Sequence, residues 1–170
     1  MWKRRAVLAA MAAGILSACS RKSSILSGAV VYSGPEVTRV ILAKGKRKLY
    51  LLNGQDVLRT YDVGLGYAPL GDKKFEGDGK TPEGRYIIDR RNPQSQYYLS
   101  LGISYPNAQD IAEARVAGKS PGGDIFIHGR AGQGYGLGRD WTAGCIAVSD
   151  RNIEEIWTMV KNGTVIDIIA

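Results

Sequence analysis

Short apolar segments separated by turn residues constrain the fold of this chain more than any other feature. The segments are rich in Val, Ile, Leu and Tyr, and Gly, Pro, Asn and Asp lie between them. Runs of this length and composition are typical of β-strands, and their close spacing favours a sandwich or barrel over a parallel α/β sheet. We therefore expect strands at Arg39–Ala43, Lys48–Leu52, Val57–Val63, Gly84–Asp89, Asp124–Ile127, Gly144–Val148 and Thr164–Ile169.

Two segments carry helix signals instead. Asn107, followed three residues later by Asp110, is typical of a helix start, and we expect this helix to run to about Val116 and to end at Gly118. A second helix begins at Ser149 or Asp150 and runs to about residue 160. Its apolar residues recur at helical spacing and fall on one face, namely Ile153, Ile156, Trp157 and Val160.

The region between the fourth expected strand and the first helix is ambiguous. Tyr97, Tyr98 and Tyr105 are suited either to line a groove or to pack in the core, and core is the better interpretation for at least half of them. The stretch 64–84 is rich in Gly, Pro and Asp and should be mostly loop. The predicted fold class is mainly β with α (α+β), a β-sandwich of mixed sheets with two short helices.

The first 19 residues have the pattern of a targeting signal rather than of part of the fold. Lys3, Arg4 and Arg5 form a positive start, and the apolar run Ala6–Ile15 is too short for a membrane span of about 20 residues. The tetrad that ends at Cys19 resembles a bacterial lipobox, whose cysteine is lipidated, although an ordinary secretory signal also fits. We expect a signal peptide at 1–19, a tether at 20–35 and one catalytic domain at 36–170.

A lipidated Cys19 implies a location and a membrane partner. The residue after the cysteine is Ser20 rather than Asp, which by resemblance to bacterial lipoproteins implies the outer membrane, facing the periplasm. The net charge of +7 falls by the three basic residues of the leader to about +4 on the mature chain. That charge is diffuse, and the absence of a basic stripe or recognition helix argues against a nucleic-acid partner.

His128 is the only histidine of the chain, and Cys145 is one of two cysteines. Five glycines lie within ten residues between them. A thiol is mostly neutral at pH 7, and a neighbouring imidazole is the usual means of activating it, so we interpret Cys145 as a nucleophile and His128 as its base. The alternative is a buried structural cysteine with a core histidine. Lipidation of Cys19 would leave Cys145 without a disulfide partner, which favours the catalytic interpretation.

These residues resemble the catalytic motif of the L,D-transpeptidase (YkuD) family. The matching elements are His128–Gly129, a spacer in the mid-teens, then Thr142–Ala143–Gly144–Cys145–Ile146, and the upstream Thr81–Pro82–Glu83–Gly84. The resemblance covers roughly 38–169. The stretches DWTAGCIAVSD and SYPN are most similar to exported members of the YafK type. Ala143 and Ala147 depart from the residues that many members carry there, which leaves acceptor recognition open.

The resemblance implies a mechanism and roles for the site residues. Cys145 attacks a carbonyl of a diaminopimelyl residue in a peptidoglycan stem peptide, a D-amino acid leaves, and a thioester remains. The carbonyl of Gly129 orients the imidazole of His128, backbone N–H groups near Gly144 bind the oxyanion, and Thr142 supports the pocket. Arg139 is a candidate to meet a carboxylate of the stem.

Three functions stay open from the sequence. The first is a transpeptidase that cross-links peptidoglycan or attaches a protein to it, and the second is an amidase that uses the same thioester with water. The third is a non-catalytic wall-binding lipoprotein. We expect no cofactor and no metal, because one His and one unmodified Cys are too few ligands and the carboxylates of Asp72, Glu76 and Asp78 suit a polar loop. A wall-attached lipoprotein is a further possible partner, and we expect a monomer.

Overall fold

The computed structural model of the chain describes residues 31–133 and 138–170. Within these ranges it contains strands and two helices around one core, and the predicted fold class is confirmed. The strands are β1 (Arg39–Ala43), β2 (Lys48–Asn53), β3 (Asp56–Asp62), β4 (Gly84–Ser95), β5 (Tyr98–Ile103), β6 (Phe126–His128), β7 (Ile146–Ala147) and β8 (Val165–Ile169), and the helices are α1 (Ala108–Val116) and α2 (Asp150–Met159).

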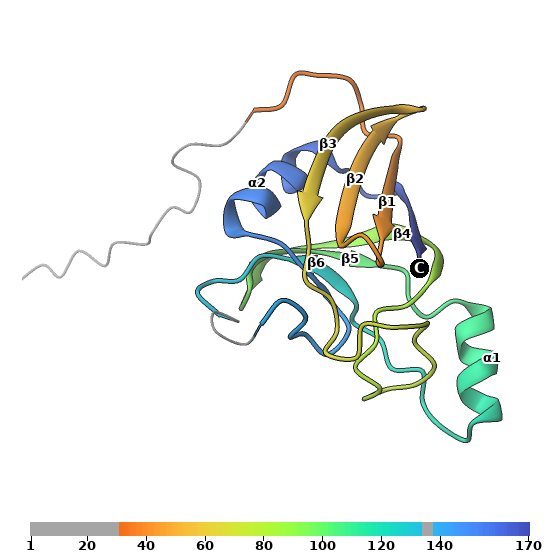
Figure 1. Ribbon diagram of the computed structural model, residues 1–170. Helices are drawn as coiled ribbons and strands as arrows, with labels where there is room; N and C mark the ends of the chain where they lie inside the picture. The colour runs from red at the N-terminus through yellow and green to blue at the C-terminus, as the bar shows by residue number, and fades with distance from the viewer. Residues whose placement is uncertain (1–30, 134–137) are drawn as a thin grey trace, which may run out of the picture.

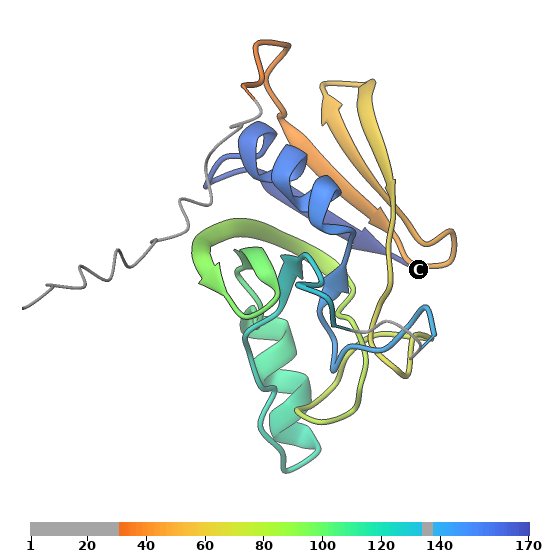
Figure 2. The same ribbon diagram turned by 90° about the vertical axis from the view of Figure 1, so that its left-hand side faces the viewer.

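The strands form one mixed sheet in the order β3-β2-β1-β8-β4-β5-β6-β7. β4 joins its two halves, because residues 84–87 pair with β8 whereas residues 88–95 pair with β5 through an irregular register. Figures 1 and 2 show β4 curving from one half to the other. Just beyond β3, Gly64 forms two backbone hydrogen bonds with Ala147 of β7, so the two outer strands of the sheet also meet. The sheet therefore folds over its own core.

The core consists of inward-facing aliphatic side chains from both halves of the sheet. α2 covers it with Ile153 and Ile156, and Val160 at the end of the helix is buried as well, as the sequence predicts. The predicted Trp157 is only partly buried, whereas Met159, which the sequence did not single out, is buried. Ser149 caps this helix by accepting a hydrogen bond from the N–H of Asn152. α2 contacts β5 and β6, the strands that lead to the functional site.

α1 lies at the other end of the molecule from α2 (Figure 1). It begins with a capping box. The side chain of Asn107 accepts a hydrogen bond from the backbone N–H of Asp110, and the side chain of Asp110 accepts one from the backbone N–H of Asn107. Its buried residues are Asp110 and Ala114. The small buried face explains why this helix is held by polar contacts rather than by an apolar stripe.

β5 and the second half of β4 are the elements that the sequence did not reveal. β5 is buried on both faces, so it lacks alternation, and it contains Gly102. The outer half of β4 is polar and largely exposed. The three tyrosines of this region divide, since Tyr105 is in the core whereas Tyr97 and Tyr98 are half-buried.

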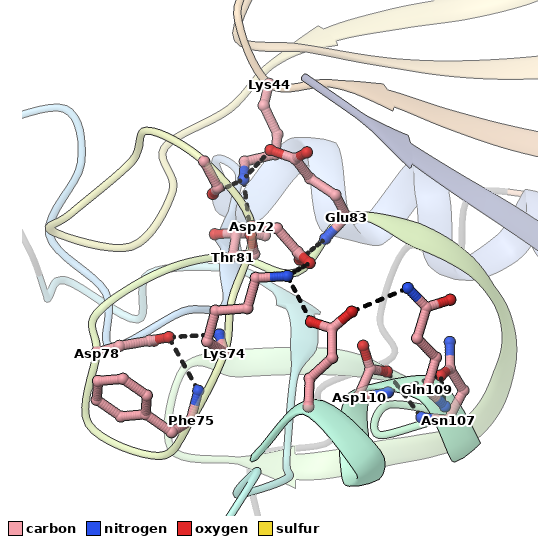
Figure 3. A network of polar contacts seen from close by, with 12 residues as sticks. Lys44, Asp72, Lys74, Phe75, Asp78, Thr81, Glu83, Asn107, Gln109 and Asp110 are labelled. Atoms are coloured by element: carbon pink, nitrogen blue, oxygen red, sulfur yellow. Dashed lines mark hydrogen bonds and ion pairs between the residues drawn. The ribbon is translucent and has the colours of Figure 1, made fainter. Parts of the chain in front are cut away.

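The loop 64–83 is anchored to the sheet by a buried lysine. Lys44, which follows β1, is 2% exposed and donates hydrogen bonds to the carbonyls of Gly71 and Thr81 and to Glu83. Figure 3 shows this ammonium between the loop and the start of β4. Each charge-assisted contact contributes about 1.5–3 kcal/mol. The loop that the sequence predicts is therefore irregular but firmly held.

The acidic residues of this loop bind lysines and backbone groups. Asp72 pairs with Lys74, which also bonds to Glu113 of α1 (Figure 3). Asp78 forms a buried ion pair with Lys73 at 2.9 Å. Within the described residues, no helix is long and apolar enough to span a membrane.

Candidate functional site

The imidazole of His128 is fixed at the end of β6. Its Nδ1 lies 2.6 Å from the carbonyl oxygen of Gly129, and because a carbonyl only accepts, Nδ1 carries the proton. The neutral ring therefore presents an unprotonated Nε2. Gly129 is required here for space as well, since a Cβ would lie 2.6 Å from Oδ1 of Asp150.

Aromatic rings enclose His128 and keep water away. The ring of Tyr97 lies 4.5 Å from the imidazole with an interplanar angle of 30°, and Trp141 meets it edge-on at 5.9 Å. His128 is 2% exposed, and this burial lowers its pKa below the ordinary value, although the hydrogen bond to Gly129 opposes the shift. The imidazole is therefore neutral at pH 7.

Cys145 lies at the same edge of the sheet. It immediately precedes β7, which runs parallel to β6 with Ile127 opposite Ile146. The thiol donates a hydrogen bond to the carbonyl oxygen of Asp124 at 3.4 Å. Burial raises the pKa of the Cys145 thiol, and the backbone of Phe126 opposes this only in part. The resting site thus contains a neutral thiol and a neutral imidazole.

One cavity contains both groups. It has a volume of about 550 Å³, which is within the range of small-molecule sites. Its walls come from the turn between β4 and β5, from β6 and from the residues that precede β6 and β7. The lining residues are Asn92, Gln94, Ser95, Gln96, Tyr97, Ser100, Asp124, Phe126, His128 and Cys145.

Thr142 and Gly144 shape the turn that carries the thiol. The buried hydroxyl of Thr142 donates to the carbonyl of Cys145 at 2.7 Å and accepts the N–H of Gly144 at 3.2 Å. The structure therefore engages the Gly144 N–H, one of the groups that we expected near an oxyanion. Gly144 adopts φ +140°, a backbone conformation that side chains disfavour.

Arg139 is the predicted site residue that the structure places elsewhere. Its guanidinium bonds to the carbonyl of Val63 and to Asp62, and it lines a second cavity of about 260 Å³ rather than the cavity of Cys145. The expectation that Arg139 meets a carboxylate of the stem peptide stays a prediction, and this position would have it do so outside the thiol cavity. Ala147 lines the second cavity, whereas Ala143 is exposed.

Sequence reasoning missed Trp141 and Asp124, and it named Tyr97 only as one of three tyrosines suited to a groove or to the core. Trp141 and Tyr97 enclose the imidazole, and Asp124 provides the carbonyl that the thiol binds. Trp141 is adjacent to the cysteine motif in the sequence, which was a usable signal. The positions of Tyr97 and Asp124 depend on the β4–β5 hairpin and on backbone geometry. In the described residues, no group of three or more His, Cys, Asp or Glu is arranged to hold a metal ion. Cys19, with the signal 1–19 and most of the tether, lies outside the described residues.

Known proteins are similar to this chain in sequence and in fold. The family model of the L,D-transpeptidase catalytic domain, YkuD, matches residues 38–168. YafK of Escherichia coli strain K12, a candidate L,D-transpeptidase by its name, is 32% identical over 121 residues, which are 69% of this chain and 44% of YafK.

Solved structures agree with the sequence matches. The helical cell shape determining protein Pgp2 of Campylobacter jejuni superposes with a TM-score of 0.59 and 30% identity, over 81% of this chain and 49% of Pgp2. An L,D-transpeptidase of Xylanimonas cellulosilytica, with a TM-score of 0.51 and 13% identity over 82% and 63% of the two chains, shares the fold alone. The chain spans about half the length of YafK and Pgp2. On the match of its residues 38–168, the chain belongs to the L,D-transpeptidase catalytic domain family.

Proposed function

We propose that this protein transfers acyl groups of peptidoglycan stem peptides through a thioester on Cys145, with His128 as the general base and acid. The observation that supports it most is the shared cavity, which is lined both by the thiol of Cys145, just before β7, and by His128 of the neighbouring parallel strand β6, whose Nε2 is unprotonated. Membership of the L,D-transpeptidase catalytic domain family supports peptidoglycan as the substrate class.

The geometry suggests an order of events. The thiol proton passes to Nε2 of His128 as Sγ attacks the carbonyl, because burial disfavours a preformed thiolate–imidazolium pair. The protonated imidazole then donates that proton to the amine of the departing D-amino acid, and the thioester remains. Since the Gly144 N–H is held by Thr142, we assign the oxyanion to the N–H of Cys145.

The same proposal includes a place in the cell. A lipidated Cys19 would anchor the domain at the periplasmic face of the outer membrane, with residues 20–35 as a tether to the wall. An enzyme held there would act in cell-wall biogenesis. The similarity to Pgp2, named as a determinant of helical cell shape, supports a role in cell shape.

The acceptor decides between cross-linking and cleavage. Incubation of the purified protein with tetrapeptide muropeptides and with wall-attached lipoprotein, followed by mass spectrometry, separates the two. We expect new dimers or new protein–wall linkages, in which the amine of an acceptor resolves the thioester. Released peptide or protein without new linkages would instead make the protein an amidase that uses the same Cys145 and His128. Products that persist unchanged in Cys145→Ala would refute the proposal and leave a wall-binding protein.

A further inference from the structure

The thiol cavity has an unusual charge composition. Of the described residues that line it, Asp124 is the one carboxylate, and no Lys or Arg is among them. The other polar lining groups are neutral amides and hydroxyls, and His128 is neutral because it is buried. Among these lining residues the carboxylate of Asp124 is therefore the one formal charge, which favours a cation over an anionic group at its end of the cavity.

Asp124 presents two different groups to this cavity. Its backbone carbonyl accepts the hydrogen bond of the Cys145 thiol, which fixes the residue next to the reacting atom. Its side chain is 87% exposed, and the nearest cation, Nη2 of Arg90, is 3.7 Å away, beyond hydrogen-bond distance. The carboxylate therefore lies at the solvent end of the cavity with acceptor positions open to a ligand.

We propose that Asp124 is a specificity-determining residue that binds a primary ammonium group carried by the acyl donor close to the carbonyl that Cys145 attacks. This inference rests on the proposed function, and it assigns Asp124 as the group that binds the second amine of the diamino acid that the family resemblance already implies in the donor. A carboxylate is the matching partner for an ammonium group, and a charge-assisted hydrogen bond of this kind changes affinity by about tenfold or more. A donor whose amine is acylated would lose that contact.

Asp124 also influences the nucleophile. The charged groups that act on the thiol are the carboxylate of Asp124, which raises the pKa of Cys145, and the ammonium of Lys73, which lowers it. His128 lines the same cavity as a neutral group. A bound ammonium would neutralise the field of Asp124, so the cationic donor would itself ease removal of the thiol proton. Recognition and activation are thus linked through one side chain.

The variant Asp124→Asn separates these effects. Asn, like Asp, adopts the positive φ of this position (+54°) more readily than other side chains, and it keeps the backbone carbonyl. Asp89→Asn is the matched control, because Asp89 also approaches Arg90, at 3.6 Å, but does not line the cavity.

The experiment compares a stem tetrapeptide whose diamino residue has a free amine with the same peptide N-acetylated on that amine. Binding to Cys145→Ala is measured by calorimetry, which needs no turnover. We expect the free amine to bind about tenfold or more tightly, the preference to disappear in Cys145→Ala/Asp124→Asn, and Asp89→Asn to retain it. Equal affinities in Cys145→Ala, or a preference that survives Asp124→Asn, would overturn the assignment.

A second readout distinguishes this proposal from the proposed function. Alkylation of the thiol by neutral iodoacetamide should be as fast or faster in Asp124→Asn, even though kcat/KM for the free-amine peptide falls. A merely structural role for Asp124 would slow both the alkylation and the turnover of the free-amine peptide, and that result would overturn the assignment. Absence of any Cys145-dependent turnover in the unmodified protein would refute the proposed function, whereas the calorimetric preference would still test Asp124.

Discussion

The carbonyl oxygen of Lys80 lies 2.7 Å from the position that a Cβ of Gly144 would occupy. This contact places the loop 64–83 directly against the residue that precedes the nucleophile. The loop is in turn fixed by the buried ion pair of Lys73 and Asp78 and by Lys44. The position of the thiol therefore depends on a network of residues that do not themselves line the cavity.

Gly144→Ala should displace Cys145. The new Cβ meets a backbone oxygen that cannot rotate away, and φ +140° is strained for alanine. We expect acylation of Cys145 to fall by about 100-fold or more, as measured by intact mass after treatment with a carbapenem. Gly123→Ala is the control, because nothing lies within 4 Å of its Cβ position. Normal acylation of Gly144→Ala would show that the contact with Lys80 does not position the thiol.

The Cys145 thiol should lose its proton only at high pH, and the imidazole of His128 should gain a proton only at low pH. Burial raises the pKa of Cys145 and lowers that of His128, so both are neutral across the middle of the pH range. Alkylation by iodoacetamide should therefore rise steeply only above the ordinary thiol pKa of about 8.5. Turnover, which needs neutral His128, should decline only below about pH 6.5. An alkylation midpoint near pH 6 or lower would instead indicate a preformed thiolate.

Thr142→Val should lose two hydrogen bonds at once. The hydroxyl bridges the carbonyl of Cys145 and the N–H of Gly144, and its removal leaves both buried backbone groups without that partner. We expect a loss of about 1–3 kcal/mol in the free energy of unfolding and slower acylation. Thr142→Ser keeps the hydroxyl and should retain most of both properties. Equal behaviour of the two variants would show that the hydroxyl contributes nothing.

Asp78→Asn should destabilise the protein in a pH-dependent way. Burial alone would raise the pKa of Asp78, but hydrogen bonds from the backbone N–H groups of Lys74 and Lys80 and from the Lys73 ammonium bring it below its ordinary value. A lowered pKa contributes stability above the unfolded value of about 3.9, and that contribution is lost as the pH falls through the folded value. The variant also leaves Lys73 buried and unpaired, at a cost of about 3–5 kcal/mol at pH 7.

Urea denaturation between pH 3 and pH 7 measures this effect. The difference between the unmodified protein and Asp78→Asn should be largest at neutral pH and should shrink below about pH 4. Asp62→Asn is the control, since its exposed ion pairs with Lys48 and Arg139 each contribute less than about 1 kcal/mol. A difference that is constant with pH would contradict the assigned role of the buried pair.

The sequence predicts much of this fold because local signals and tertiary structure agree. Asn107 and Ser149 cap the helices as their side chains suggest, and the short apolar runs form strands. β5 was not predictable in the same way, because a strand buried on both faces shows no alternation. The bend of β4 arises from its two different partners, which only the folded sheet brings together.

The site also combines residues with a local sequence signal and residues whose roles depend on the tertiary structure. His128 and Cys145 are visible in the sequence because their residue types and glycine-rich setting indicate chemistry. Tyr97 and Asp124 reach the cavity through a hairpin and a positive φ, and neither feature leaves a sequence pattern. Arg139 lines the second cavity instead, because a basic residue near the motif in sequence need not face the same cavity in space.

The most direct measurement of the central claim is covalent capture of the nucleophile. The purified protein is incubated with a carbapenem, and intact mass with peptide mapping locates the adduct. We predict one adduct on Cys145, none in Cys145→Ala and a much slower reaction in His128→Gln. Absence of an adduct, an adduct on another residue, or an unchanged rate in His128→Gln would contradict a Cys145 nucleophile activated by His128.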